Sequence, residues 1–300
     1  PERIIMPSAA VKRCLTMAIA DTFGVCANVE FSFLAQWLWR QVGQLVPVQK
    51  TSPFSSTVLV WRILRLLEEP GFADSYPRLS AYLSSSDELM RYDLAARLAS
   101  LMEQYVIYRP DWLSAWAKGE RVDIVPADHK KFDTIESDQR WQAALWRQIA
   151  AETGTLEKQP VELFFEAISD NEEKAASLLD ARIHLFCEPS IAPQYIEMLE
   201  KLGHLIDIEL YVLNPCREYW FDIIDSRKLA YLANRQKDLY HETGNALLAS
   251  WGKQTKASLE SMHDRLDNIE REDDAFISNA ELGVPETLLS HLQDAIFDLR

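Results

Sequence analysis

The stretch formed by residues 182–220 constrains the fold of this chain more than any other, because it has the pattern of a strand, a helix and a second strand. Residues 183–186 form a short, largely apolar run, and apolar residues then recur at three- and four-residue spacing up to Leu202. A second apolar run, residues 206–213, stops before Pro215, which cannot donate a hydrogen bond to a sheet. Two strands joined by one helix usually run parallel in the same sheet. We therefore predict an α/β fold with a parallel sheet.

The N-terminal residues repeat this pattern on a smaller scale. Residues 3–6 have the composition of a short strand, and Ser8 is placed to cap a helix over residues 9–22. Residues 25–31 are predicted to form the next strand, and residues 33–42 another helix. Two α/β pieces therefore bracket the middle of the chain.

The middle of the chain differs from both α/β pieces, because its apolar residues follow helical spacing over long distances. After Trp220 the pattern is helical again, with an acidic helix that ends near Glu272 and a last helix over residues 285–299. The predicted boundaries are 1–52 for the first part of the α/β domain, 53–179 for a large all-α helical insertion, 180–222 for the second α/β part and 223–300 for a C-terminal helical segment.

The net charge of the chain limits how it can bind nucleic acid. With 31 basic and 46 acidic residues the net charge is -15, the wrong sign for independent capture of a phosphate backbone. No apolar run approaches the roughly 18 residues of a membrane span, and the N-terminus lacks the pattern of a secretion signal. The four cysteines lie far apart in the sequence and form no CxxC pair, so we interpret them as reduced thiols. We expect a soluble, cytoplasmic protein in which DNA binding needs a local basic or aromatic surface, or a basic partner.

The sequence lacks the motifs of the common nucleotide and metal sites. It has no GxxxxGK[ST] phosphate loop, no GxGxxG and no HExxH. Glu188 follows a predicted strand, where an ATPase places a magnesium-binding carboxylate, but without a phosphate loop we interpret it as a remnant or a cap. The acidic run at residues 270–274 is linear, whereas a two-metal nuclease needs carboxylates that converge from several elements. We therefore predict no catalytic residue, metal site or cofactor site in this chain.

Three segments stand out by their density of aromatic and arginine residues: residues 103–112, 214–220 and 244–252. Aromatic rings beside arginine suit base stacking and phosphate contact. The same residues also suit an ordinary junction between a helix and a loop. The residues alone leave both interpretations open.

Four uncommon motifs occur in a fixed order along the chain. They are an opening block in which a strand, Ser8 and a helix precede FGVCANVEF, and then YRPDWL, NPCREYW and GNALLASWGK. Together they resemble the amino-terminal part of the RecC family, the gamma subunit of bacterial exonuclease V, the RecBCD helicase-nuclease. The resemblance covers nearly the whole chain and is weakest in the middle of the predicted insertion.

The resemblance implies a degenerate superfamily 1 helicase-like domain, which keeps the α/β framework of P-loop NTPases and has lost the ATPase motifs. It implies a subunit that hydrolyses nothing by itself, with ATP and Mg expected on RecB- and RecD-like partner subunits. Such a subunit handles single-stranded and forked duplex DNA, scans one strand for Chi, and serves double-strand-break repair by homologous recombination. No membrane role is implied.

The resemblance also implies which residues contact the DNA strand. They are Pro7, Ser8, Ala9, Arg13, Phe33, Trp39, Ser100, Leu101, Glu103, Gln104 and Arg109. The arginines could hold phosphates or guanine edges, Gln104 and Ser8 could bond bases, and Phe33 could stack. Ala9 has no hydroxyl group with which to contact a base, so the sequence supports strand handling better than recognition of one particular Chi octamer.

An alternative remains, in which the chain is a purely architectural domain at subunit interfaces and never touches DNA. The positions of Tyr105, Tyr108, Arg109 and Trp112 discriminate between the two. A groove that they line together with Arg13 would favour DNA contact, whereas burial in a helix junction would favour architecture.

Overall fold

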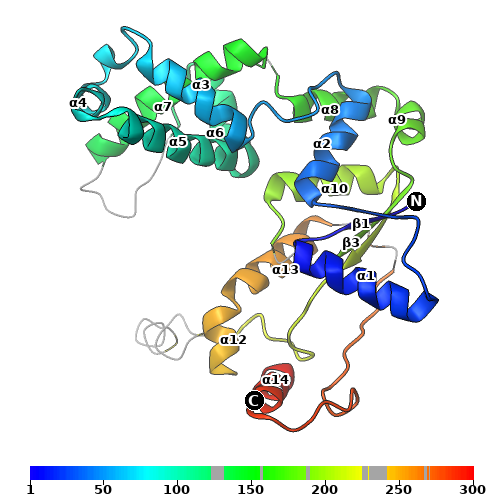
Figure 1. Cartoon of the computed structure of the whole chain (residues 1–300). Coiled ribbons are helices and arrows are strands. Elements are labelled where there is room, and N and C mark those ends of the chain that lie inside the picture. Colours follow the sequence, from blue (N-terminus) through cyan, green and yellow to red (C-terminus); the bar gives the residue numbers. More distant parts are fainter. Residues whose placement is uncertain are drawn as a thin grey trace. The chain divides into compact units, whose positions relative to one another are not determined.

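The computed structural model describes residues 1–122, 132–155, 158–186, 190–224, 229, 242–266, 269 and 271–300. In chain order the elements are β1 (Glu2–Ile5), α1 (Ala9–Phe23), β2 (Val29–Ser32), α2 (Leu34–Leu45), α3 (Ser56–Glu68), the 3-10 helix η1 (Ala73–Ser75), α4 (Pro77–Ser85), α5 (Glu88–Tyr108), α6 (Pro110–Ala117), α7 (Phe132–Thr153), α8 (Pro160–Asp170), α9 (Glu172–Leu178), β3 (Arg182–Phe186), α10 (Pro193–Gly203), β4 (Asp207–Tyr211), α12 (Ala246–Trp251), α13 (Lys253–Arg265) and α14 (Leu288–Phe297) (Figure 1). None of these described helices is long and apolar enough to cross a membrane.

The chain forms two compact units. The first unit comprises Pro1–Leu34, Arg182–Ile191 and Leu199–Arg300. The second comprises Ala35–Ala181 and Ala192–Met198. The sheet therefore belongs to the first unit, and α3 to α9 belong to the second.

Four parallel strands form the sheet, in the order β2-β1-β3-β4. β1 lies between β2 and β3, so the N-terminal α/β piece and the one at residues 182–220 share one sheet. Ile4 lies opposite His184, and Leu185 lies opposite Leu210. The predicted α/β class and the parallel sheet are confirmed.

The two faces of the sheet differ in burial. Ile5, Ile183 and Leu185 point to one face and are 0% exposed. On the other face His184 lies between carboxylates of both neighbouring strands, with Nε2 at 3.3 Å from Glu2 Oε2 and Nδ1 at 3.0 Å from Glu209 Oε2. Parallel sheets usually owe their stability to apolar burial, and here the first face provides it.

α1 and β2 show which local predictions were right. Ser8 has extended backbone angles, and its Oγ accepts the N–H of Val11 at 3.3 Å, so the predicted N-cap is confirmed. The helix ends at Gly24, whose φ of 78° lies in the left-handed region that glycine adopts readily. The predicted strand over residues 25–31 is wrong at its start, because Asn28 has a φ of 59° and breaks the extended run.

Helices alone make up the regular structure described between β2 and β3. α3 and α5 pack along each other, with Leu59 and Ile63 of α3 and Ala95 of α5 each 0% exposed. α6 and α7 add Trp116 and Trp146, and Trp146 Nε1 donates a hydrogen bond to the backbone of α6 at 3.0 Å. One large apolar cluster thus holds these helices together.

Asp180 joins the start of the second unit to the segment that precedes β3. Its Oδ2 accepts hydrogen bonds from Trp37 Nε1 at 2.8 Å, from Arg40 Nη2 at 2.9 Å and from Gln41 Nε2 at 2.9 Å. Its backbone N–H donates to Gln41 Oε1 at 3.2 Å. One carboxylate therefore fixes α2 by several polar contacts.

The C-terminal helices are shorter than predicted. α13 ends at Arg265, and Glu272, where the acidic helix was predicted to end, is not helical. α14 begins at Leu288 and not at Pro285. Thr287 caps it, with Oγ1 accepting the N–H of Ser290 at 3.1 Å.

Candidate nucleic-acid interface

The carboxyl edge of the sheet brings together two segments that were predicted to contact DNA. Pro7 and Ser8 follow β1, and Phe33 follows β2. The two strands pair in parallel, and Met6 N donates a hydrogen bond to Ser32 O at 3.0 Å, so the two segments leave the sheet next to each other. Phe33 is 42% exposed at this edge.

α1 begins at the same edge and adds positive charge to it. Ser8 Oγ accepts a backbone N–H of the first helical turn, and its hydroxyl group can still donate. Ala9 and Arg13 are exposed, and Lys12 Nζ lies 5.5 Å from the centroid of the Phe31 ring. The positive end of the helix dipole, the two cations and the hydroxyl group can together hold a phosphate. The prediction from sequence omitted Lys12, although its position next to Arg13 in the first turns of α1 was visible.

The other predicted contact residues belong to the second unit. They are Trp39, Ser100, Leu101, Glu103, Gln104 and Arg109. Ser100 and Gln104 are exposed on α5, whereas Leu101 is partly buried. Trp39 Nε1 donates a hydrogen bond to Gln49 O at 2.9 Å, so this indole already has a partner within the protein.

Glu103 has a partner in a neighbouring helix. Its Oε1 accepts the backbone N–H of Ser56, the first residue of α3, at 3.1 Å. The first N–H groups of a helix have no partner within the helix, and a carboxylate there also interacts favourably with the helix dipole. Glu103 therefore stabilises the start of α3 from its position on α5.

Arg109 lies at the junction of α5 and α6. Its guanidinium carbon is 3.9 Å from the centroid of the Trp112 ring, and its Nη2 is 2.9 Å from Asp111 Oδ2. The hydrogen bond from Arg109 lowers the pKa of the Asp111 carboxyl group below its ordinary value. Tyr105 packs against Trp112 and Trp116, with ring centroids 5.6 and 5.7 Å apart. Tyr105 and Trp112 thus pack in a helix junction, as the architectural alternative requires, whereas Tyr108 is 52% exposed.

The motifs NPCREYW and GNALLASWGK pack against each other in the first unit. Trp220 of the first motif is 2% exposed and lies in one apolar cluster with Leu248 of the second. Asn214 Oδ1 accepts the Trp220 indole N–H at 3.0 Å. A Cβ atom at Gly252 would lie 3.0 Å from the Trp220 ring, and one at Gly244 would also meet a side chain of the cluster, at 2.7 Å. Both glycines of the second motif therefore allow close packing.

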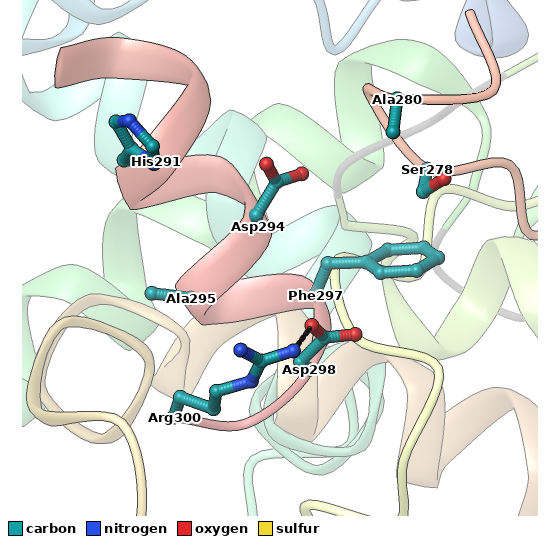
Figure 2. Close-up of a pocket in the computed structure, with 8 residues that line it drawn as sticks. All are labelled: Ser278, Ala280, His291, Asp294, Ala295, Phe297, Asp298 and Arg300. Carbon is teal, nitrogen blue, oxygen red and sulfur yellow. Dashed lines mark hydrogen bonds and ion pairs between the residues drawn. The ribbon is translucent and has the colours of Figure 1, made fainter. Parts of the chain in front are cut away.

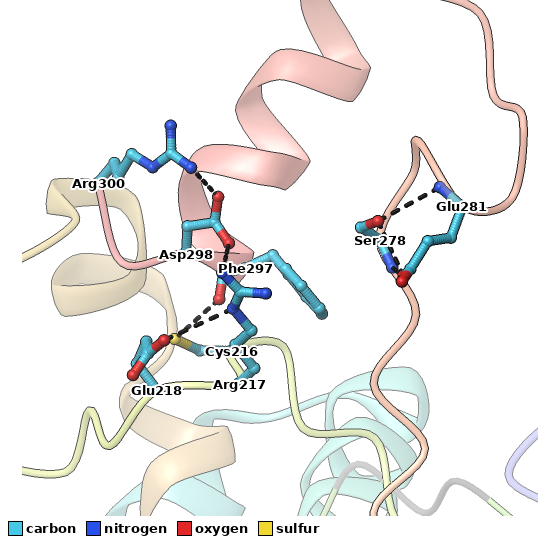
Figure 3. A network of polar contacts seen from close by, with 8 residues as sticks. All are labelled: Cys216, Arg217, Glu218, Ser278, Glu281, Phe297, Asp298 and Arg300. Carbon is cyan, nitrogen blue, oxygen red and sulfur yellow. Dashed lines mark hydrogen bonds and ion pairs between the residues drawn. The ribbon is translucent and has the colours of Figure 1, made fainter.

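The same two motifs hold the end of α14, and Figure 3 shows the contacts that the first motif makes there. Arg217 Nη2 is 2.8 Å from Asp298 Oδ1, and its guanidinium carbon is 5.2 Å from the centroid of the Phe297 ring. Cys216 Sγ donates to Phe297 O at 3.4 Å, and burial raises the pKa of this thiol. Asn245 Nδ2 donates to the backbone carbonyl of the last residue of the chain at 2.7 Å. We call these contacts the C-terminal joint.

An open hollow of about 320 Å³ lies beside the C-terminal joint, between α14 and the segment that precedes it (Figure 2). Its lining mixes Asp294 and Asp298 with Arg300 and His291. The pairing of Asp298 with Arg300 compensates charge within the hollow, and Asn279 Nδ2 donates to Asp294 Oδ1 at 3.0 Å. The hydrogen bond from Asn279 fastens the segment to α14.

Glu188, the predicted remnant of a magnesium ligand, lies outside the described residues. Its role stays a prediction. The aromatic residues that are most accessible in the distinctive motifs are Trp251, at 80% exposed, Phe23, at 76%, and Tyr219, at 69%.

Comparison with known proteins agrees with the resemblance of the motifs. The family described as RecC, N-terminal domain, matches residues 1–299. The RecBCD enzyme subunit RecC of Escherichia coli (strain K12) is 29% identical over 332 residues, which cover 100% of this chain and 28% of that protein. The subunit of the same name from Haemophilus influenzae is also 29% identical, over 83% of this chain and 26% of that protein.

A more distant relative has the same name. The RecBCD enzyme subunit RecC of Mycolicibacterium smegmatis is 26% identical over 98% of this chain and 25% of its own length. The chain thus spans about a quarter of the length of these relatives. Because the family match extends over nearly every residue, the chain belongs to the family of RecC N-terminal domains.

Proposed function

We propose that this chain is a non-catalytic, DNA-handling part of an ATP-dependent helicase-nuclease, exodeoxyribonuclease V, in double-strand-break repair by homologous recombination. In this role it guides a single strand away from a forked duplex and takes part in scanning for Chi. The names of its relatives, which are subunits of the RecBCD enzyme, support the proposal. RecB- and RecD-like subunits are then its partners, and ATP and Mg²⁺ act on those subunits.

The observation that carries the proposal is the shared edge of β1 and β2. The segment after β1 provides Ser8 and the exposed Ala9, and the segment after β2 provides the exposed ring of Phe33. Arg13 and Lys12 stand on the helix that starts there. A protein binds single-stranded DNA through contacts to the phosphates and by stacking side chains on the bases, and this edge offers groups for both.

The framework is compatible with a degenerate superfamily 1 helicase-like domain. The resemblance implies an opening segment that lies on single-stranded DNA and a helical insertion within the α/β domain. Here the described elements between β2 and β3 are helices, and β1 pairs with β3 across that interruption. We propose that residues 53–179 are such an all-α insertion.

The test uses the full-length subunit assembled with its partners and a forked duplex. Arg13→Ala with Phe33→Ala should weaken crosslinking to the single strand, and the loss of one cation should reduce the salt dependence of binding by about one unit of slope. Arg182→Ala is the matched control, because Arg182 stands at the amino end of β3 and pairs with Asp207. Unchanged crosslinking and unchanged Chi-dependent products in the double variant would remove this site.

The contacts of Arg109 and Glu103 favour a second candidate, an architectural domain without direct DNA contact. Both side chains are bonded within the second unit, to Asp111 and to the backbone of Ser56. In that case Arg109→Ala should lower the thermal stability of the subunit, while the crosslinking of each assembled complex to DNA stays at the wild-type level. A loss of crosslinking at unchanged stability would exclude this reading for Arg109.

A further inference from the structure

Phe33 is the single residue between β2 and α2. β2 ends at Ser32, and α2 begins at Leu34. On the strand side the sheet holds the backbone, because Met6 N donates a hydrogen bond to Ser32 O at 3.0 Å. On the helix side the rotation of α2 sets how the chain leaves Phe33. Since a residue has only two rotatable backbone bonds, the direction of the exposed Phe33 ring is fixed only when both elements are held.

The buried face of α2 carries polar groups that need directional partners. Trp37 is 1% exposed and Gln41 is 0% exposed, and Arg40 lies beside them at helical spacing. Asp180 Oδ2 accepts a hydrogen bond from each of these side chains, at 2.8 Å from Trp37 and at 2.9 Å from the other two. Apolar burial has no preferred direction, whereas a hydrogen bond weakens steeply when its angle changes. Asp180 therefore fixes the rotation of α2 about its axis more closely than the apolar face does.

Asp180 is itself held in place. Its backbone N–H donates to Gln41 Oε1 at 3.2 Å, so Gln41 both donates to Asp180 and accepts from it. The side chain of Asp180 is 16% exposed, which limits competition from water. All of these contacts lie within the second unit. They join the first turns of α2 to the segment that leads into β3, which begins at Arg182.

We propose that Asp180 is a positioning residue for strand binding: by holding the first turns of α2, it keeps the Phe33 ring in the direction in which the ring stacks on a base. The inference rests on the proposed function, in which Phe33 is the stacking residue. Asp180 acts through α2 and does not touch the strand. A ring that is already oriented loses less conformational freedom when a base stacks on it, and binding is stronger for that reason.

Hydrogen exchange tests the hold on α2 without DNA, in the full-length subunit assembled with its partners. Asp180→Ala should speed the exchange of the α2 amides by about tenfold or more, because buried donors lose their acceptor. Asp180→Asn keeps one acceptor oxygen and should have a smaller effect. Asn214→Ala is the matched control, because it also removes the acceptor of a buried indole N–H, that of Trp220, and should leave α2 unchanged. Exchange of α2 at the wild-type rate in Asp180→Ala would overturn the proposal.

Crosslinking tests the effect on the strand. A photo-crosslinking phenylalanine derivative at position 33 of the same complex, saturated with a forked duplex, should link to a narrow set of nucleotides. In the Asp180→Ala background the yield should fall severalfold and the links should spread over more nucleotides. A crosslinker at position 13 of α1 should keep its yield, and Asn214→Ala should change neither crosslink. Equal losses at positions 33 and 13 would overturn the positioning role, because they would show a general loss of strand binding.

A double variant separates positioning from a merely structural role. If Asp180 acts through Phe33, Asp180→Ala should weaken strand binding in wild type but add no further loss in the Phe33→Ala background. Additive losses would overturn the proposal. Failure of the proposed function is seen separately, as the absence of crosslinks at both positions in wild-type complexes that assemble normally. Crosslinks that form at position 33 and do not change in Asp180→Ala would overturn this inference alone.

Discussion

Replacing Asp180 by alanine tests whether one carboxylate holds α2 in place. Asp180 Oδ2 accepts the Trp37 indole N–H at 2.8 Å, and it accepts Arg40 and Gln41 at 2.9 Å each. Trp37 is 1% exposed and Gln41 is 0% exposed, so water cannot replace the lost acceptor at these two donors. The side chain of Arg40 is 34% exposed and can be hydrated.

The magnitude follows from this difference in exposure. A buried neutral donor left without a partner costs about 1–3 kcal/mol. Two such donors, with the contribution of Arg40 largely removed by solvent, give a loss of about 3–4 kcal/mol for Asp180→Ala. Asp180→Asn keeps one acceptor oxygen but removes its charge, and charge-assisted bonds are roughly twice as strong as neutral ones, so this variant should lose about 1–2 kcal/mol.

Urea unfolding near pH 7, followed by tryptophan fluorescence, measures these losses. Asp207→Ala is the control, because the pair of Asp207 with Arg182 is exposed and its loss should change the free energy of unfolding by less than about 0.5 kcal/mol. The order Asp180→Ala, Asp180→Asn, Asp207→Ala is expected from the largest loss to the smallest. A loss below about 1 kcal/mol for Asp180→Ala would show that α2 is held by its apolar face alone.

Two further predictions concern the C-terminal joint. Burial raises the pKa of the Cys216 thiol, and its Sγ donates to Phe297 O. A thiol reagent at pH 8 should therefore modify the exposed Cys14 well before Cys216, as followed by mass spectrometry. Equal rates of modification would contradict the burial of the Cys216 thiol. Asn214→Ala removes the acceptor of the Trp220 indole and should lower the free energy of unfolding by about 1–3 kcal/mol in urea, and a loss near zero would mean that water replaces the amide.

Local chemistry explains which parts of the fold could be predicted from the sequence. The Oγ of Ser8 caps α1 by accepting the N–H of Val11, only three residues along the chain. The strand predicted over residues 206–213 is present, although it ends at Tyr211, before Pro215 is reached. The parallel sheet followed from the strand-helix-strand order of residues 182–220. The stacking of Arg109 on Trp112 was also visible in principle, because the two residues are neighbours across one helical turn.

Contacts between distant residues explain what could not be predicted. Nothing local to Glu103 indicates that it binds the N–H of Ser56, and nothing local to Arg217 indicates Asp298. In the candidate site, Phe33 lies beside the segment after β1 because β1 and β2 pair. The sequence indicates this pairing only through the order of the two strands along the chain. Such contacts depend on the packing of whole elements and not on the spacing of a motif.

Tyr195 of α10 provides a test of packing within the second unit by pH. Burial of its hydroxyl group, with Glu103 and Tyr108 nearby, raises the pKa of Tyr195 to about 12. In the unfolded chain a tyrosine ionises at about pH 10. Above pH 10 the unfolded state therefore releases a proton that the folded state keeps, so the free energy of unfolding falls as the pH rises.

The loss approaches about 1.4 kcal/mol for each pH unit between about 10 and 12, and it is small below pH 10. Tyr195→Phe removes this ionisation and leaves the other tyrosines unchanged as an internal control. Urea unfolding at pH 9, 10 and 11 should show wild type losing about 1 kcal/mol more than Tyr195→Phe between pH 10 and 11. Parallel losses in the two proteins would mean that the Tyr195 hydroxyl group is hydrated, and that α10 does not bury it near Glu103 and Tyr108.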